Sequence, residues 1–434
     1  MQFSVAALAA DLGGRLDGPD VTVDGLAIDS RVIRPGRLFA AVRAERDGHD
    51  FVPDAVAAGA SAVLVERPQP DVPSVVVPDV AAALLRLGSV ARDRLPERVV
   101  GVTGSVGKTT TKDLLAGALA TTYATAASER SFNNELGVPI TLANAPDGTE
   151  AAVVEMGARG PGHIALLCST ARPTVGIVTL VAAVHTEFMG GLDGITVAKR
   201  ELVESLPRSG AAVLNADDER VAGMAVHTAA EVVTFGDAGA VRAADVVVDA
   251  ELRPSFRLDS PWGSAPVRLG VRGVHNLANA LAAAAAALWL GVAPGDVAAG
   301  LAQPPASPWR MELVRTEGGP TVLNDAYNAG PASMAAALRA LASLDARRRV
   351  AVLGVMAELG DDAPTEHRSV AALASELGIE LVAVGTDLYG VDPLGGPEAA
   401  VAALAGLGPE AAVLVKGSRV AGLEAVAEGL VAGR

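Results

Sequence analysis

The sequence predicts an α/β protein of three domains, and three observations support this fold class. The chain has 434 residues, which at roughly 150 residues per domain is enough for about three domains. Apolar runs typical of buried strands alternate with helical stretches, as in parallel sheets covered by helices. Proline-containing breaks occur near residues 97 and 305. We therefore expect domains at residues 1–97, 98–305 and 306–434.

The first predicted domain is a small α/β unit. Short β-type runs occur at residues 37–42, 61–65 and 74–77, and alanine-rich helical stretches separate them. Prolines mark the turns and element ends between these runs, as is typical of such residues; they are Pro73, Pro78 and Pro96.

The second and third predicted domains are built on parallel sheets. Continuous apolar runs predict central strands at Val99–Thr103, Ala151–Glu155, Val175–Leu180 and Ala211–Leu214. Three prolines between Gln303 and Pro308 cannot lie inside a helix or a central strand, so this stretch is a predicted linker. Beyond it, similar runs predict a smaller, doubly wound, Rossmann-like sheet, with strands at Arg349–Leu353, Glu380–Val384 and Ala411–Val415.

The composition excludes several classes of function. A net charge of −15 disfavours nonspecific nucleic-acid binding and docking on an anionic membrane. The longest apolar run, at residues 280–293, is shorter than the about 20 residues of a membrane span. The first residues lack the cationic segment of a signal peptide, and the single cysteine, Cys168, excludes an intrachain disulfide. We expect a cytoplasmic monomer without membrane insertion or a nucleic-acid partner.

A glycine-rich loop between a strand and a helix predicts a nucleotide site. Its residues are Gly104, Ser105, Val106, Gly107, Lys108, Thr109 and Thr110, and the helical stretch Lys112–Ala120 follows. Glycines let successive backbone N–H groups point at phosphate oxygens, and the helix N-terminus adds its positive dipole end. Lys108 would reach the β- and γ-phosphates, and the Thr109 hydroxyl would ligate Mg²⁺.

Two features of this loop leave alternatives open. The strict Walker spacing requires glycine where Val102 stands, so a glycine-rich turn without a ligand is the alternative reading. A GTPase-type switch would need an Asn-Lys-x-Asp guanine reader, and the nearest pattern, Asn215–Asp218, lacks the lysine. The missing lysine therefore disfavours the GTPase reading.

One lysine lies on the apolar face of a predicted helix at residues 194–206. Ile195, Leu202, Val203 and Leu206 share the face of Lys199. Burial there would lower the pKa of the amine, and CO₂ could convert the neutral amine into a carbamate. The alternative is that Lys199 extends its charged end to solvent.

Two further side chains follow predicted central strands. Glu155 ends one strand, and His185 follows the strand that ends near Leu180. Ligands gather at the carboxyl ends of parallel strands, so both residues would lie beside the phosphate loop. A carboxylate and an imidazole there suit Mg²⁺ or Mn²⁺, although a structural role is the alternative for each.

Taken together, these motifs resemble the Mur ligase family. The matching residues occur in family order: the phosphate loop, Asn133-Asn134, Glu155, His185, Lys199, His275-Asn276 with Asn279, Arg310 and Asp325. The resemblance implies that Lys108, Lys199, His185 and Glu155 are catalytic, and that Thr109, Glu155 and His185 carry Mg²⁺. Lys199 would be the carbamylated lysine of the family. The loop residues together with Asn276, Asn279, Arg310 and Asp325 would bind ATP.

Within the family, three stretches resemble members that join D-alanyl-D-alanine to a UDP-linked muramoyl tripeptide. They are residues 324–331, 353–360 and 416–419. Residues 29–31 and 47–51 resemble the uridine-diphosphate domain of those enzymes. The implied substrate-binding residues are Ser30, Arg31, Asp47, His49, Asn133, Asn134, Tyr327, Asn328, Lys416, Ser418 and Arg419. The implied reaction proceeds through an acyl phosphate, and we expect the C-terminal domain to close over the nucleotide.

Other activities stay open at this point. A ligase for the third amino acid shares the N-terminal pattern, but its Asp-Asn-Pro-Arg signature is absent from the sequence. A polyglutamate-type ligase is a second possibility. A non-catalytic nucleotide-binding relative is a third, because the chain departs from the family pattern at Val106, Leu180 and Gly330.

Overall fold

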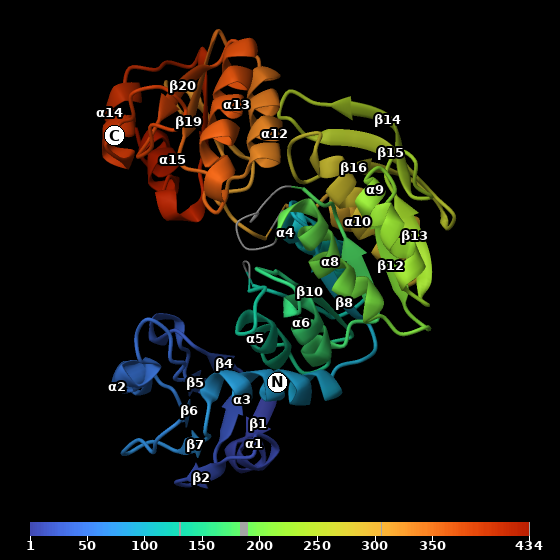
Figure 1. Ribbon diagram of the computed structural model, residues 1–434, viewed down its shortest axis with the longest axis vertical. Coiled ribbons are helices and arrows are strands. Elements are labelled where there is room, and N and C mark those ends of the chain that lie inside the picture. Colours follow the sequence, from blue (N-terminus) through green and yellow to red (C-terminus); the bar gives the residue numbers. More distant parts are fainter. Residues whose placement is uncertain (130–131, 183–189, 305, 434) are drawn as a thin grey trace.

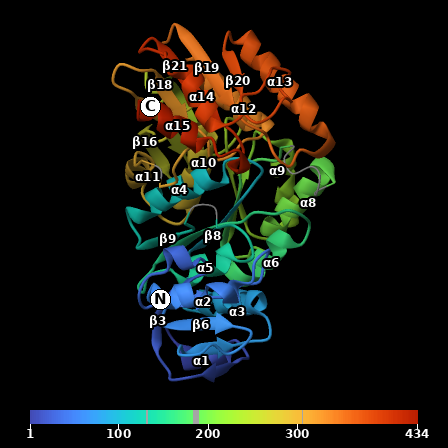
Figure 2. The same cartoon turned by 90° about the vertical axis from the view of Figure 1, so that its left-hand side faces the viewer.

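The computed structural model describes residues 1–129, 132–182, 190–304 and 306–433. Three α/β units follow one another along the long axis of the molecule (Figure 1). The N-terminal unit lies at one end and the C-terminal unit at the other. In the view turned by 90°, the C-terminal unit lies above the helices of the central unit (Figure 2). The α/β class is therefore confirmed, whereas the boundaries at residues 97 and 305 stay predictions.

The N-terminal unit contains a five-stranded sheet of order β2-β7-β6-β5-β4, in which the β2–β7 pair alone is antiparallel. A separate two-stranded antiparallel sheet pairs β1 with β3. The elements are β1 (Gln2–Ser4), α1 (Val5–Asp11), β2 (Arg15–Asp17), β3 (Thr22–Asp24), β4 (Leu26–Ala27), η1 (Ser30–Val32), β5 (Leu38–Ala40), η2 (Gly48–Phe51), α2 (Val52–Ala57), β6 (Ala62–Val65), β7 (Ser74–Val76) and α3 (Val80–Asp93).

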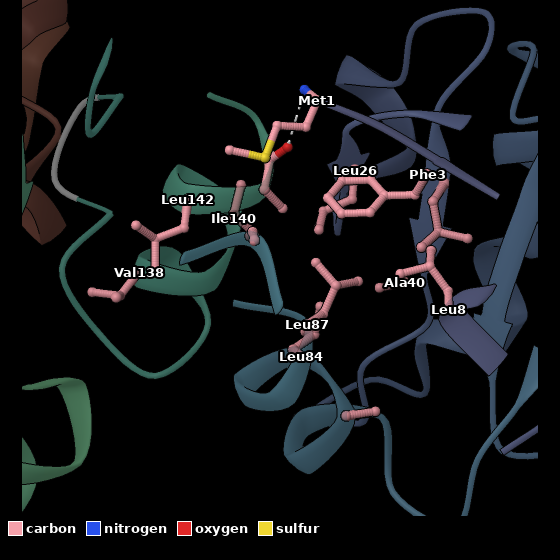
Figure 3. Packing of buried hydrophobic residues seen from close by; sticks show 14 of the residues in the cluster. Met1, Phe3, Leu8, Leu26, Ala40, Leu84, Leu87, Val138, Ile140 and Leu142 are labelled. Carbon is pink, nitrogen blue, oxygen red and sulfur yellow. Dashed lines mark hydrogen bonds between the residues drawn. The ribbon is translucent and has the colours of Figure 1, made fainter. Parts of the chain in front are cut away.

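The N-terminal and central units share one hydrophobic core. Leu84 and Leu87 of α3 belong to the same buried cluster as Ile140 of the central helix α5 (Gly137–Ala143) (Figure 3). The helix α3 can approach closely because Gly88 has no side chain, and a Cβ there would lie 2.9 Å from the Cα of Pro139. Asn144, at the C-terminal end of α5, accepts a hydrogen bond from Leu26 N at 2.7 Å and donates one to Leu26 O at 3.0 Å. The two units are therefore joined by packing and by a bidentate amide contact.

The central unit is built on a six-stranded parallel sheet of order β13-β12-β11-β8-β10-β9. The strand β8 (Val99–Thr103) lies between β11 and β10, so the loop after β8 emerges where the chain departs to both sides of the sheet. Its other elements are α4 (Lys108–Ala120), β9 (Thr125–Ala127), α5, β10 (Ala151–Glu155), α6 (His163–Ala171), β11 (Val175–Val178), α8 (Gly191–Glu204), β12 (Ala211–Asn215), α9 (Glu219–Ala222), η3 (Gly223–His227) and β13 (Glu231–Phe235).

The central unit continues into a part that the apolar pattern did not predict. A three-stranded antiparallel sheet, of order β14-β15-β16, precedes the helices α10 and α11. One face of this sheet is solvated, so buried apolar residues alternate with more exposed ones in β15 and β16, while β14 has no buried residue. The elements are β14 (Arg242–Val248), β15 (Pro254–Ser260), β16 (Gly263–Arg268), α10 (Asn276–Trp289) and α11 (Pro294–Leu301).

The C-terminal unit has a five-stranded sheet of order β17-β18-β21-β19-β20. All neighbours are parallel except β17 and β18, which form an antiparallel edge. Its elements are β17 (Glu312–Arg315), β18 (Thr321–Asn324), α12 (Pro331–Ala342), β19 (Arg348–Leu353), η4 (Gly360–Asp362), α13 (Ala363–Glu376), β20 (Glu380–Ala383), α14 (Pro397–Leu404), β21 (Ala411–Lys416), η5 (Arg419–Ala421) and α15 (Glu424–Val431). Among the described residues, no helix combines the length and the apolar character needed to cross a membrane.

Candidate active site

The phosphate loop has a shape that requires glycine at two positions. Gly104 has φ +146°, and a Cβ there would lie 1.8 Å from Oγ1 of Thr179. Gly107 has φ +89°, and a Cβ there would lie 2.2 Å from Oδ1 of Asn279. The helix α4 begins at Lys108, four residues earlier than predicted, so the first turn of the helix is part of the loop. Thr109 and Thr110 are buried in that turn.

Backbone and hydroxyl contacts tie the loop to the segment that follows β11. Thr179 Oγ1 donates to Val106 O at 2.6 Å, and Ser105 N donates to Leu180 O at 2.8 Å. Asn215 Nδ2, from the end of β12, donates to Thr179 O at 2.9 Å. Because Val106 and Leu180 take part through their carbonyl groups, their departure from the family pattern leaves these contacts intact.

The side chain of Lys108 lies over the phosphate loop that precedes it. Its Nζ donates to Gly104 O at 2.8 Å and to Ser105 O at 3.2 Å. Desolvation and the nearby charge of Arg310 lower the pKa of the Lys108 ammonium, and the charge of Glu155 opposes this change. Three sequence-predicted residues from separate elements therefore interact electrostatically at one place.

Glu155 has one carboxylate oxygen available for a cation. Asn133 Nδ2 donates to Glu155 Oε1 at 2.8 Å, and Glu155 N donates to Ser128 Oγ at 3.1 Å. The second oxygen, Oε2, is buried and has no hydrogen-bond partner among the described residues. A buried carboxylate oxygen without a donor is costly unless a cation or a donor group occupies its neighbourhood. The geometry at Glu155 thus fits a divalent cation.

The predicted histidine ligand cannot be placed. His185 lies outside the described residues, and within the described part of the chain no cluster of three or more His, Cys, Asp or Glu could hold a metal. Asn134, predicted beside Asn133, accepts a hydrogen bond from Gly137 N at 2.9 Å at the start of α5. Asn133 is therefore in the site, whereas Asn134 shapes the segment that carries it.

Lys199 is buried on α8, as the apolar face predicts. Its residue is 3% exposed, which excludes the alternative that its end reaches solvent. Desolvation, followed by the charge of Lys108, lowers the pKa of Lys199 to about 7. A large fraction of the side chain is thus a neutral amine near neutral pH.

This shift predicts a pH-dependent stability that Lys199→Met should remove. The pKa of Lys199 is lower in the folded chain than its ordinary 10.5, so the unfolded chain binds more protons between these two values. The free energy of unfolding therefore rises with pH from about 7 to about 10.5. Below about pH 7 the full destabilisation by the buried Lys199 is present. Between pH 7 and pH 9 the advantage of Lys199→Met over wild type should shrink by roughly 2 kcal/mol.

Urea unfolding in CO₂-free buffer at several pH values measures this difference. A difference between the two proteins that stays constant with pH would contradict the buried, neutral amine.

The start of α10 completes the central-unit side of the site. Asn279 Oδ1 lies 3.3 Å from Thr111 Oγ1, which donates to it, and Asn279 Nδ2 donates to Asn276 Oδ1 at 2.7 Å. Desolvation by the surrounding protein lowers the pKa of His275 although the residue is exposed, while the charge of Asp325 raises this pKa and the charge of Lys416 lowers it. These two residues belong to the C-terminal unit, so that unit faces the site at α10.

The C-terminal residues form a second, facing group. The Arg310 guanidinium lies 4.2 Å from the centre of the Tyr327 ring. The buried Lys416 forms an ion pair with the partly buried Asp325 and donates to Asn328 O at 2.9 Å.

The next residues of the C-terminal unit fix the neighbouring loops. Ser418 Oγ accepts a hydrogen bond from Ala357 N at 2.9 Å, and Arg419 lies 4.6 Å above the Trp309 ring. Gly330 is extended at the start of α12, and its N–H donates to Ser333 Oγ at 3.1 Å.

The predicted residues of the N-terminal unit form a separate group. Arg31 pairs with Asp29 at 2.7 Å beside Ser30, and its side chain is exposed. His49 is buried, its Nδ1 lies 2.6 Å from Asp47 Oδ1, and its Nε2 accepts a hydrogen bond from Glu66 N at 3.0 Å. Both ring nitrogens thus serve the fold of this unit, and Asp47 and Arg31 remain closer to solvent.

Sequence reasoning missed several residues that hold the site together. They are Thr179, Asn215, Ser128 and Asp113. Each acts on a residue far away in the sequence, and no local pattern marks such a contact. For Thr179 and Asn215, their positions at the carboxyl ends of predicted strands were the available signal.

Comparison with known proteins follows the same three units. Residues 22–92 match the Mur ligase family catalytic domain, residues 102–287 the Mur ligase middle domain, and residues 309–419 the Mur ligase glutamate ligase domain. The three-domain prediction is thereby confirmed.

Relatives match over nearly the full length. A UDP-N-acetylmuramoyl-tripeptide–D-alanyl-D-alanine ligase from Mycobacterium bovis is 41% identical, with 100% of this chain and 98% of that protein covered. MurF from Acinetobacter baumannii is 31% identical with a TM-score of 0.88, covering 100% and 99% of the two chains. A MurF ligase from Thermotoga maritima in complex with ADP is 26% identical with a TM-score of 0.81, covering 95% and 98%. The chain belongs to the Mur ligase family.

Proposed function

We propose that this chain is an ATP-dependent amide ligase that joins D-alanyl-D-alanine to a UDP-N-acetylmuramoyl tripeptide. The observation that carries the proposal is the grouping around the phosphate loop. Glu155 of the central unit and Arg310 of the C-terminal unit act on the pKa of Lys108, whose ammonium lies on the loop, and the charge of Lys108 acts on the pKa of Lys199. The full-length similarity to ligases of this specificity in other bacteria supports the choice of substrates.

The proposed reaction has two steps. The terminal carboxylate of the tripeptide attacks the γ-phosphorus of ATP, which forms an acyl phosphate and releases ADP. The amine of D-alanyl-D-alanine then attacks the acyl carbon, phosphate leaves with the bonding electrons, and the amine loses a proton. Lys108 and Arg310 would neutralise the charge on the transferring phosphoryl group, and this kind of catalysis depends mainly on positioning.

A magnesium ion belongs to the proposal. The Thr109 hydroxyl, Glu155 and His185 would hold it, and the unpartnered Oε2 of Glu155 supports this assignment. When bound, Mg²⁺ supplies positive charge to the phosphate oxygens. Asn133 keeps the Glu155 carboxylate in a fixed orientation through its 2.8 Å hydrogen bond.

The three units would divide the substrates. Ser30, Arg31, Asp47 and His49 would shape the site for the uridine-diphosphate end, with His49 acting through Asp47. The central unit would hold ATP together with Asn276 and Asn279. The C-terminal residues Tyr327, Asn328, Lys416, Ser418 and Arg419 would receive the dipeptide. A cytoplasmic location, where ATP and nucleotide-linked precursors occur, is part of the proposal.

Phosphate release tests this function. The purified protein is incubated with ATP, Mg²⁺, D-alanyl-D-alanine and one UDP-muramoyl acceptor at a time: dipeptide, tripeptide or no acceptor. Of the three acceptor conditions, we expect turnover only in the one that contains the tripeptide. Mass spectrometry should then find the pentapeptide product. Turnover with the dipeptide acceptor and a single amino acid would favour another ligase of the family. ATP binding without acceptor-dependent phosphate release would favour a non-catalytic relative.

A further inference from the structure

The segment that carries Arg310 is held by three carboxylates. Ser307 N donates to Asp113 Oδ2 at 3.1 Å, Trp309 N to Glu312 Oε1 at 2.8 Å, and Met311 N to Asp325 Oδ1 at 3.1 Å. Alternate backbone N–H groups on either side of Arg310 are thus bound by acceptors. Charged acceptors form the stronger hydrogen bonds of proteins, so this segment has a defined conformation.

The backbone on both sides of Arg310 is unusual. Trp309 has φ +58° and Met311 has φ +53°, and residues with a side chain seldom adopt such values. A conformation of this kind persists only where the surrounding structure determines it, and it is common where a protein presents a functional group. Tyr327 contributes further support, because its ring lies 4.2 Å from the Arg310 guanidinium and its N–H donates to Trp309 O at 3.3 Å.

Only one of the three carboxylates belongs to the central unit. Asp113 lies on α4, the helix that starts at the phosphate loop, and it forms a buried ion pair with Lys112 at 2.8 Å. Lys112 Nζ donates to Ser128 O at 2.7 Å, and Ser128 Oγ accepts from Glu155 N at 3.1 Å. A buried polar network therefore connects the start of the C-terminal unit with the helix of the phosphate loop and with Glu155.

We propose that Asp113 is a positioning residue that pins the C-terminal unit to the phosphate-loop helix through the N–H of Ser307 and thereby places Arg310 at the transferring phosphate. Ser307 is 4% exposed, and Arg310 follows it by three residues, so a shift of this anchor moves the guanidinium directly. The electrostatic influence of Arg310 on Lys108 agrees with such a placement. This inference rests on the proposed function for the identity of the reaction, but the anchor itself acts on nucleotide binding.

Two substitutions at Ser307 isolate the anchoring N–H. Ser307→Pro removes the donor and leaves the Asp113–Lys112 pair in place, whereas the matched control Ser307→Ala keeps the N–H and removes the hydroxyl. We expect Ser307→Pro to weaken the binding of a non-hydrolysable ATP analogue with Mg²⁺ about tenfold, the size of effect typical of one hydrogen bond to a charged group. Ser307→Ala should change this affinity less than about twofold.

A double-mutant cycle with Arg310→Ala separates positioning from a structural role. In the Arg310→Ala background, Ser307→Pro should weaken analogue binding by less than about twofold, because the anchor then has no guanidinium to place. Asp113→Asn provides a second route, since it keeps the shape of the side chain and removes the charge of the acceptor. The effect of Asp113→Asn on analogue binding should depend on Arg310 in the same way. Unchanged thermal unfolding of the Ser307 variants is the check on folding.

The outcomes are distinct. The inference would be overturned if Ser307→Pro and Asp113→Asn each lost as much affinity for the analogue in the Arg310→Ala background as in the wild-type background. It would also be overturned if Ser307→Ala lost as much affinity as Ser307→Pro. If Ser307→Pro does not fold, the Asp113→Asn cycle decides alone. Analogue binding needs no muramoyl substrate, so a failure of the proposed function appears in wild-type turnover and leaves this test intact.

Discussion

Lys108→Ala is expected to reduce tripeptide-dependent phosphate release by about a thousandfold or more. The ammonium group donates hydrogen bonds to Gly104 O and Ser105 O of the phosphate loop, and the charges of Glu155 and Arg310 act on its pKa. Loss of a preorganised group that stabilises developing charge typically costs about 10²–10³ in rate, and the loop also loses its only long cationic side chain. Stopped-time assays with saturating tripeptide and D-alanyl-D-alanine measure the change.

The control for Lys108→Ala is a cation outside the site. Arg348 forms an exposed pair with Glu380 on the C-terminal sheet at 2.8 Å, and Arg348→Ala should leave turnover within about twofold of wild type. Near-normal turnover of the Lys108 variant, with its product verified, would remove the phosphate loop from the mechanism.

Gly104→Ala is expected to weaken nucleotide binding by about a hundredfold or more. The added Cβ would stand 1.8 Å from Thr179 Oγ1 while φ is +146°, so the loop must shift and its N–H groups turn away from the phosphates. Such a displacement also breaks the contact of Thr179 with Val106 O. Calorimetric titration with an ATP analogue measures the affinity, and a loss smaller than about fivefold would mean that the loop tolerates the side chain.

Gly148→Ala is the matched control for Gly104→Ala. Gly148 has φ +81°, and a Cβ there would have no atom within 4 Å. The substitution therefore has the cost of a left-handed backbone without the steric conflict. We expect a loss of about 1 kcal/mol in stability and unchanged affinity for the nucleotide.

Much of the fold could be predicted because buried parallel strands leave a local signal. Val99–Thr103 and Ala151–Glu155 are observed with the predicted bounds. The helix of Lys199 begins at Gly191 instead of residue 194, because the first turn of a helix needs no apolar face. The sheet β14–β16 was not predicted, since a half-exposed antiparallel sheet has weaker apolar runs than a buried one.

Burial could be predicted where one candidate residue carries its own signal, whereas the role of that residue stays a prediction. Lys199 is such a residue, because its apolar neighbours on the helix predict burial and the structure confirms it. Asp113 and Ser128 could not be found in this way. Their roles depend on Ser307 and on the N–H of Glu155, and the sequence does not say which distant backbone groups will meet an acceptor.

The roles of the N-terminal residues stay predictions for a related reason. Asp47 and His49 are placed by hydrogen bonds within their own unit. Local hydrogen bonding and substrate binding select the same polar residue types, so the sequence pattern alone does not separate them.

The core shared by the first two units has a mechanical consequence. Leu84 and Leu87 belong to the same cluster as Ile140, and the Asn144 amide forms two hydrogen bonds with the backbone of Leu26. The C-terminal unit, by contrast, is joined to the central unit more sparingly. One of its two hydrophobic clusters includes a single buried residue of the central unit, Leu252, and the hydrogen bond from Ser307 N to Asp113 is a polar contact beside it. We therefore expect any domain movement to displace the C-terminal unit against a body formed by the first two units. In the proposed reaction, such a movement would carry the amine-bearing substrate to an acyl phosphate that stays in place.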